Sequence, residues 1–258
     1  MVQIFETQLI MWSPQELSPE QIHRCMNTVS AYAFYFIVGD ALVSGKNLSC
    51  VRMADGEKML MDICNESDSE YIEVSPQFDE KWHKQFGIVG IPRKVLKERL
   101  MMAATGANYY SPSLSGVTMG NYNVDGFNKQ KKYVDNYFAY IWFDELKQQL
   151  YQQAKHVCMI HGNPNTANAL KSRAKKFLDV EVTWIQLTNW DQADNVIKQA
   201  RQVDAPLTIF SAGPASKYIG PSIAFSGNIP KVTLDIGQAM DRWTLLSLYE
   251  ADKKLQQV

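Results

Sequence analysis

Short apolar runs alternate with helical patterns along the C-terminal half of the chain. Four runs have the length and the β-branched content of buried strands: residues 156–162, 180–187, 206–213 and 231–237. After each run, a polar start leads into apolar residues at helical spacing. Strands that alternate with helices are typical of a parallel sheet covered on both faces. The pattern therefore predicts an α/β fold with a mostly parallel sheet flanked by helices.

The N-terminal half shows the same patterns with more interruptions. Ser18, followed by Pro19 and Gln21, is typical of a helix start, and the apolar residues after it predict a helical extension over about residues 17–44. "LSCVRM" at residues 48–53 predicts a strand, and "EYIEVS" at residues 70–75 a shorter one. Pro92 opens a further helix. The stretch "VDNYFAYIWFDELKQQLYQQ", residues 134–153, predicts one long aromatic helix.

A central segment of about residues 105–132 shows neither the apolar spacing of a helix nor the alternation of a strand, and it is rich in Gly, Asn, Ser and Tyr. Unstructured loops longer than about 12–15 residues are usually lids, binding loops or disordered segments. Aromatic side chains stack on sugars or bases, and nearby lysines suit phosphates. We therefore expect this loop to meet an acceptor, through Tyr109, Tyr110, Tyr122, Phe127, Lys129, Lys131 and Lys132.

Composition narrows the class of protein. The chain has 258 residues, 46% of them hydrophobic, and a net charge of -1, which fits a single domain over residues 1–258 with the extension and the loop described above. This charge excludes a globally basic nucleic-acid binder but allows a local basic groove, for example at Lys171–Lys176. Four cysteines without a C-x-x-C pair indicate free thiols and a reducing, cytoplasmic location. No apolar stretch is long enough for membrane insertion.

Glycines mark the predicted strand ends. Gly56, Gly162, Gly213 and Gly237 each lie where a strand passes into a helix. Ligands of open α/β sheets bind beyond the carboxyl ends of the strands, and the N–H groups of helix starts favour anions. Neither a P-loop nor G-x-G-x-x-G is present. The four junctions favour a phosphate-bearing ligand and allow a mononucleotide or a nucleotide sugar.

The tripeptide Asp55-Gly56-Glu57 follows the first of these strands and has two interpretations. Two carboxylates around a glycine on a sharp turn can face one hard cation, and Mg²⁺ or Mn²⁺ takes one or two carboxylates plus phosphate oxygens. Arg52 would then pair with a phosphate. In the alternative, Asp55 caps the helix and Glu57 favours its dipole. Lys217, at a later helix start, is expected to be solvated.

Four stretches, in order, resemble the GT-D glycosyltransferases. "LSCVRMADGEKMLM" is similar to the family's strand with Arg-x-x-Asp-Gly-Glu, and "GIVGIPRKVL" to its Gly-Ile-Pro segment. "HVCMIHG" resembles its strand ending in His-Gly, and "LTIFSAGPASKYIGPSIA" with "VTLDIGQAMD" its Gly-Pro loop and terminal Asp-Ile-Gly segment. The resemblance covers about residues 48–241. It implies a Rossmann-like GT-D type glycosyltransferase fold and an enzyme that depends on nucleotide sugars.

The resemblance also implies roles for individual residues. Asp55 and Glu57 would hold Mn²⁺ or Mg²⁺ against the diphosphate of a nucleotide-sugar donor, with a UDP-sugar expected, and Arg52 would neutralise phosphate charge. His161 and Asp235 would contact the nucleotide or act as the base that deprotonates the acceptor hydroxyl. Structural readings stay open for both: a hydrogen-bonded histidine and a helix-capping carboxylate. Gly56, Gly162, Gly213 and Gly237 would let the backbone approach the donor.

The last motif departs from the family at one residue. Where the family commonly has His after Asp-Ile-Gly, this chain has Gln238, so any role of that histidine is altered or lost.

Three alternatives remain for the function. The family implies a glycan on a bacterial surface protein as acceptor, whereas the aromatic and lysine content also permits a hydroxymethylated base in DNA. A non-catalytic nucleotide-binding module is an alternative of another class. A two-metal phosphoesterase would need a denser cluster of ligands.

Overall fold

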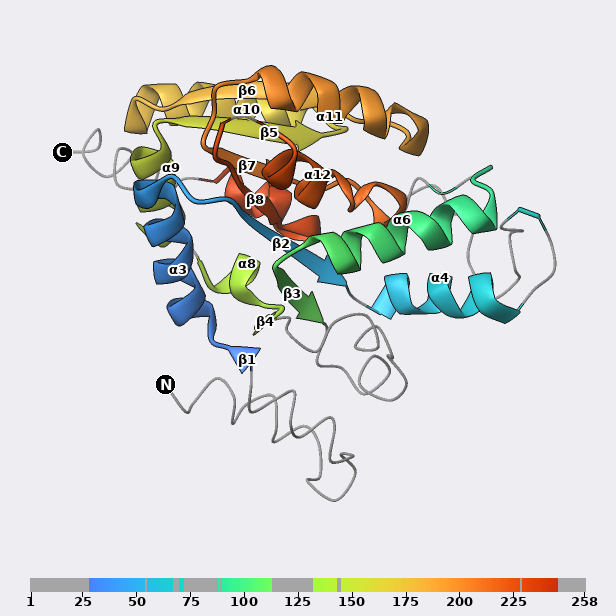
Figure 1. The fold of residues 1–258 in the computed structure, drawn as a ribbon. Coiled ribbons are helices and arrows are strands. Elements are labelled where there is room, and N and C mark those ends of the chain that lie inside the picture. Colours follow the sequence, from blue (N-terminus) through green and yellow to red (C-terminus); the bar gives the residue numbers. More distant parts are fainter. Residues whose placement is uncertain are drawn as a thin grey trace.

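One parallel sheet organises the molecule (Figure 1). The computed structural model describes residues 28–53, 55–66, 70–71, 88, 90–112, 132–142, 145–227 and 229–245. In this part of the chain eight strands lie in the order β1-β4-β3-β2-β8-β7-β5-β6, and every pairing is parallel. The strands are β1 Thr28–Val29, β2 Leu48–Met53, β3 Tyr109–Pro112, β4 Lys132–Val134, β5 His156–His161, β6 Glu181–Gln186, β7 Leu207–Phe210 and β8 Val232–Asp235.

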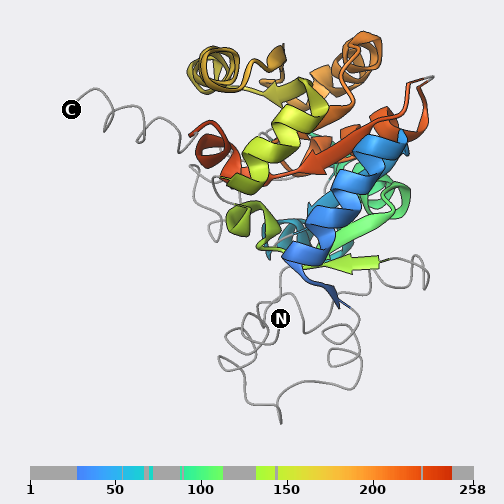
Figure 2. The same ribbon diagram turned by 90° about the vertical axis from the view of Figure 1, so that its left-hand side faces the viewer.

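Helices cover both faces of the sheet. One face packs against α3 Ala31–Ser44, α8 Phe138–Ile141, α9 Glu145–Ala154, α10 Pro164–Arg173 and α13 Met240–Trp243, and Figure 2 shows α3 and α9 side by side on this face. The other face packs against α4 Asp55–Glu66, α6 Arg93–Gly106, α11 Ala193–Gln202 and α12 Ile219–Phe225. Short turns of other helix types are η3 Ala174–Leu178, η4 Trp190–Gln192, η5 Pro214–Ser216 and η6 Gly237–Ala239.

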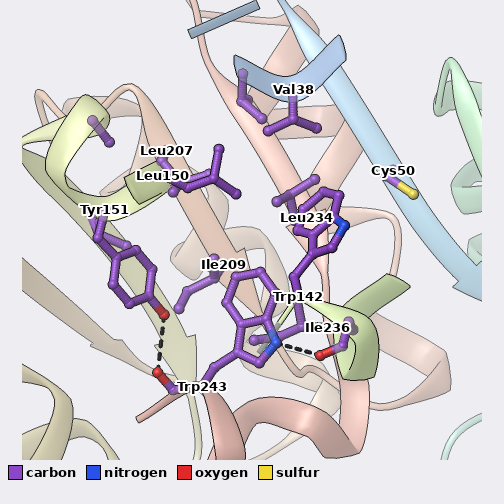
Figure 3. Packing of buried hydrophobic residues seen from close by; sticks show 14 of the residues in the cluster. Val38, Cys50, Trp142, Leu150, Tyr151, Leu207, Ile209, Leu234, Ile236 and Trp243 are labelled. Atoms are coloured by element: carbon purple, nitrogen blue, oxygen red, sulfur yellow. Dashed lines mark hydrogen bonds between the residues drawn. The ribbon is translucent and has the colours of Figure 1, made fainter. Parts of the chain in front are cut away.

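The alternation of side chains along each strand divides the core in two. In β2, Leu48 and Cys50 belong to the cluster under α3, whereas Val51 and Met53 belong to the cluster under α4 and α6, as a period of two residues requires. All six residues of β2 are buried because the strand lies in the middle of the sheet. Figure 3 shows the first cluster, where the hydroxyl of Tyr151 donates to the backbone oxygen of Trp243 at 3.3 Å.

The predicted α/β class with a parallel, helix-covered sheet is confirmed, and so are the four C-terminal strands. The helical extension over residues 17–44 was wrong in its start. Thr28–Val29 forms a strand, and α3 begins after Ser30, whose extended backbone and side-chain hydrogen bond with the N–H of Ala33 cap the helix. Residues 17–27 of the predicted extension lie outside the described residues.

Two further segments differ from the expectation. The single helix over residues 134–153 was wrong, because residues 135–137 form a turn and Trp142 ends the short helix α8 before α9. The central loop contains the strand β3, in which Tyr109 and Tyr110 are buried between neighbouring strands. These two tyrosines are therefore core residues. Tyr122, Phe127, Lys129 and Lys131 lie outside the described residues, as do residues 72–75 of the "EYIEVS" stretch.

Two other expectations concern cysteines and membranes. Cys50 and Cys158 are buried free thiols, and burial raises the pKa of both, for Cys158 to about 12. Cys64 is a partly buried free thiol, and Cys25 lies outside the described residues. Within the described ranges, no helix combines the length and the apolar character that crossing a membrane requires.

Candidate functional site

The carboxyl ends of β2 and β8 form the centre of the candidate site. These strands are neighbours in the sheet, but the chain leaves them in different directions. After β2 it passes through α4 and α6 to β3, whereas after β8 it turns toward α10, where Thr166 donates to the carboxylate of Asp241 at 2.9 Å. Ligands of open α/β sheets bind where neighbouring connections diverge in this way.

Asp235 is the last residue of β8 and is 1% exposed. Its Oδ2 accepts from the backbone N–H of Arg52 at 3.2 Å, and its Oδ1 accepts from the N–H of Gly237 at 3.1 Å. The carboxylate therefore links the end of β2 to the turn after β8. This arrangement combines the two readings of Asp235, because the carboxylate orders the following turn and also belongs to the site.

Lys217, in the segment between β7 and α12, joins the same carboxylate. Its Nζ lies 2.6 Å from Oδ2 of Asp235 and 3.3 Å from Oε1 of Glu57, and its side chain is 7% exposed. The expectation of a solvated lysine was wrong. Burial alone would lower the pKa of Lys217, but the carboxylates of Asp235 and Glu57 outweigh burial and raise it. The side chain is therefore an ammonium ion in a protein interior.

Arg52 holds the other side of the strand end. Its Nε donates to Oδ1 of Asn136 at 3.1 Å, and its Nη1 donates to the backbone oxygen of Ile236 at 2.9 Å. Its guanidinium carbon also lies 5.4 Å from the ring centroid of Tyr140, a cation–π distance. Arg242 approaches the same ring at 5.5 Å. Two guanidinium groups thus flank Tyr140 beside the carboxyl edge.

Gly237 allows this approach of Arg52. Its φ of 49° is in the left-handed region, and a Cβ at this position would lie 2.7 Å from Nη1 of Arg52. Gly213 has a φ of 66° at the start of the turn that leads to Lys217. These two glycines have left-handed backbones in the turns next to the cluster. That they let the backbone approach a donor stays a prediction.

The remaining glycines and Gln238 have more local surroundings. Gly56 is buried inside α4. Gly162 follows β5, where a Cβ would lie 2.8 Å from the backbone oxygen of Leu187, so this glycine permits close packing of two strand ends. Gln238 is exposed on η6, directly after Gly237.

The acidic tripeptide begins helix α4. Asp55 is its first residue, and its side chain lies outside the described part of the chain. Both interpretations of this carboxylate, as a metal ligand and as a helix cap, therefore stay predictions. Glu57 is buried and pairs with Lys217.

Glu57, the one carboxylate of the tripeptide whose side chain the structure describes, has oxygen donors of the kind that a hard divalent cation uses. Among the described residues, no three His, Cys, Asp or Glu side chains form a metal-binding group. The described acidic groups therefore offer no cage made of protein alone, while carboxylate oxygens of the Glu57 type suit Mg²⁺ or Mn²⁺. Such ions typically use one or two carboxylates, with substrate phosphates and water completing the shell.

His161 ends β5, two strands from β8. Its Nδ1 is buried without a hydrogen-bond partner in the described residues. Burial lowers the pKa of His161, and the carboxylate of Asp241 opposes this shift. The side chain lies near Asp241 and belongs to the edge where β5 and β7 end. The structure does not place it in the cluster of Arg52, Glu57, Lys217 and Asp235.

The basic cluster Lys171–Lys176 lies far from this edge. Helix α10 begins at the carboxyl edge after β5 and runs back along the sheet, and Lys171 and Arg173 are in its last turn. Lys175 and Lys176 follow in η3, just before β6 begins at the opposite edge. The cluster therefore does not extend a cleft at the strand ends.

Sequence reasoning missed several residues of the site. Asn136 is a buried polar residue whose Oδ1 also accepts from the hydroxyl of Ser111 at 3.3 Å. Asp135 is buried next to it, and burial raises its pKa. A strand ending before "DN" at residues 135–136 would have been the available signal, but the aromatic helical pattern concealed it.

Comparison with known proteins gives one match. The GT-D-like family, described as a GT-D fold-like domain, matches residues 29–243, most of the chain. Neither the curated proteins nor the solved structures contain a significant match. The matched range includes every strand from β2 to β8 and the clustered residues Arg52, Glu57, Lys217 and Asp235. The chain therefore belongs to the GT-D-like family, and its fold is of the glycosyltransferase type.

Proposed function

We propose that this protein is a metal-dependent glycosyltransferase that moves a sugar from a UDP-sugar to an acceptor hydroxyl. The observation that supports the proposal best is the convergence of Arg52, Glu57, Lys217 and Asp235 at the carboxyl edge of a GT-D-like sheet. These side chains come from three separate segments of the chain. Buried groups of both charges at strand ends are typical of sites that bind charged ligands.

Within this proposal, Asp55 and Glu57 hold Mn²⁺ or Mg²⁺. When bound, the cation supplies Lewis-acid stabilisation of the departing nucleoside diphosphate. Arg52 adds fixed positive charge, because its Nε and Nη1 are held by Asn136 and Ile236 while the cation–π contact with Tyr140 holds the plane of the guanidinium. Asp235 keeps Lys217 and the backbone of Arg52 in register. His161 is proposed to contact the nucleotide or the acceptor.

The acceptor in this proposal is a glycan hydroxyl. A DNA-base acceptor would need a basic cleft that continues from the catalytic edge. The Lys171–Lys176 cluster, which the sequence offered as an extension of such a cleft, lies toward the opposite edge of the sheet. Lys129 and Lys131, which would begin the cleft, lie outside the described residues. The sugar acceptor requires no such cleft.

Calorimetric titration of UDP tests the proposal. We expect wild-type protein to bind UDP with Mn²⁺ present and to lose this binding in EDTA. Asp55→Asn should weaken it by at least about tenfold, since one hard ligand is lost. The matched control is Asp40→Asn, which removes an exposed carboxylate whose ion-pair partner among the described residues is Lys46. Equal binding in EDTA, or unchanged binding by Asp55→Asn, would contradict the metal site.

Turnover is measured separately. UDP release from a panel of UDP-sugars, with and without simple glycoside acceptors, distinguishes an enzyme from a nucleotide-binding module. Metal-dependent UDP binding without any UDP release across the panel would support the non-catalytic alternative instead.

A further inference from the structure

Lys217 already pairs with Glu57, one of the two carboxylates proposed to hold the cation, and with Asp235. Its ammonium contacts Asp235 at 2.6 Å and Glu57 at 3.3 Å, and all three side chains are at most 8% exposed. With Arg52, the cluster contains two cations and two anions, so the described groups are balanced in charge. A divalent cation held by Asp55 and Glu57 would therefore meet only the charge of Asp55 in excess of these four balanced groups, because Lys217 offsets that of Glu57.

The residue after Lys217 is anchored to two neighbouring helices. The next residue, Tyr218, donates its hydroxyl to Oδ1 of Asp194 at 2.7 Å, and the guanidinium of Arg99 lies 5.0 Å from the Tyr218 ring centroid. Arg99 also donates to the backbone oxygen of Trp190 at 2.7 Å. These contacts tie the segment carrying Lys217 to α6 and α11. The backbone at Lys217 is therefore fixed, and moving the ammonium away requires breaking its contacts with Glu57 and Asp235.

Electrostatics then decides what the site binds. Charges in a buried site are screened much less than charges in water, so an ammonium close to Glu57 strongly opposes a free divalent cation. A nucleoside diphosphate brings at least two negative charges, which attract both the cation and the ammonium. The pair of cation and diphosphate is thus favoured far more than the cation alone.

We propose that Lys217 is a built-in counterion that prevents a divalent cation from binding alone, so that the cation enters together with the nucleoside diphosphate. This inference rests on the proposed function, since it concerns the same metal and donor. It makes Lys217 a positioning residue that also sets the order of binding.

The test is calorimetric titration of Mn²⁺ alone into wild-type protein and into Lys217→Met. Removing the ammonium should make Mn²⁺ bind at least about tenfold more tightly. Lys46→Met, which removes an exposed lysine paired with Asp40, is the matched control for net charge and should bind like the wild type. Lys217→Arg keeps the charge and should also bind Mn²⁺ weakly. Unchanged or weaker Mn²⁺ binding by folded Lys217→Met would overturn the inference.

A second variant covers a failure to fold. Lys217→Gln retains a hydrogen-bond donor for the carboxylates, and the same gain in Mn²⁺ affinity is expected of it. With saturating UDP, the Mn²⁺ affinity of the wild type should rise by at least about tenfold, whereas that of Lys217→Gln should rise less. Because the first titration contains no nucleotide, it tests Lys217 even if UDP proves not to bind, a result that would contradict the proposed function alone.

Discussion

Gly237 controls how closely the turn after β8 approaches Arg52. The guanidinium of Arg52 donates to the backbone oxygen of Ile236, and the N–H of Gly237 donates to the carboxylate of Asp235. A side chain at position 237 would occupy the volume of Nη1 of Arg52. At this scale, the geometry of the site depends on the absence of one Cβ atom.

Gly237→Ala tests this dependence. The left-handed backbone should lower the free energy of unfolding by about 1–2 kcal/mol, and displacement of Arg52 should weaken binding of UDP with Mn²⁺. Gly45→Ala is the control, because Gly45 has a φ of 61° but only an atom of Pro230, at 3.9 Å, near the new Cβ. Urea unfolding and calorimetry give the two readouts. Equal UDP affinities of the two variants would refute the role of Gly237.

His161 predicts a dependence of stability on pH. Its folded pKa lies below the ordinary value of 6.5, so the neutral ring is favoured in the fold. Above pH 6.5 the ring is neutral in both states, and its contribution to stability is fully present. As the pH falls from there toward the folded pKa, the unfolded chain takes up the proton first and stability declines.

Urea unfolding at about pH 8 and about pH 5 measures this effect. Wild-type protein should lose more stability between the two than His161→Gln, in which the other titrating groups are retained. An identical loss in both proteins would show that His161 titrates alike when folded and unfolded.

At the scale of elements, α12 sets the position of the segment that presents Lys217. A Cβ on Gly220 would lie 2.7 Å and 2.8 Å from ring atoms of Phe210 in β7, and 3.3 Å from the hydroxyl of Ser49 in β2. The helix therefore rests directly on two strands of the sheet. Because Lys217 lies two positions before the first residue of α12, the height of the helix above the sheet positions the ammonium.

Gly220→Ala should overpack this contact and lower the free energy of unfolding by about 1–3 kcal/mol. Gly227→Ala, beyond the end of the same helix, places its Cβ no closer than 3.8 Å to any neighbour and should be close to neutral. Chemical denaturation of both variants provides the comparison. A cost of the same size for both would point to chain entropy and not to packing.

At the scale of the whole molecule, one continuous sheet carries both cores, so the described part of the chain should unfold as one unit. Trp243 connects its last helix to the rest: Nε1 donates to the oxygen of Ala139 at 2.6 Å, and the ring packs 6.2 Å from that of Trp142. Trp243→Ala should lower the free energy of unfolding by about 3–5 kcal/mol.

Far-UV circular dichroism and tryptophan fluorescence, followed during the same urea titration, measure both the number of unfolding transitions and the free energy of unfolding. The two signals should change together in the wild type and shift by the same amount in Trp243→Ala. Two separate transitions in the wild type would indicate independent folding units and would contradict the prediction of a single domain.

Local periodicity was enough to predict the α/β class and the strands β5 to β8, because those strands are short, apolar and followed by well-marked helix starts. Motif order was enough to indicate the family that the comparison confirms. The prediction of one helix over residues 134–153 was wrong, because its aromatic residues satisfy a helical period although the chain turns at residues 135–137.

Long-range packing decided the rest. Asp235 lies 183 residues from Arg52 in the chain, and 18 residues separate it from Lys217. No local pattern relates these positions; they meet because parallel strands bring their carboxyl ends to one edge of the sheet. The same rule placed the Lys171–Lys176 cluster toward the opposite edge. Burial of the Lys217 ammonium, and with it the charge balance of the site, follows from this convergence of distant segments and was therefore visible only in three dimensions.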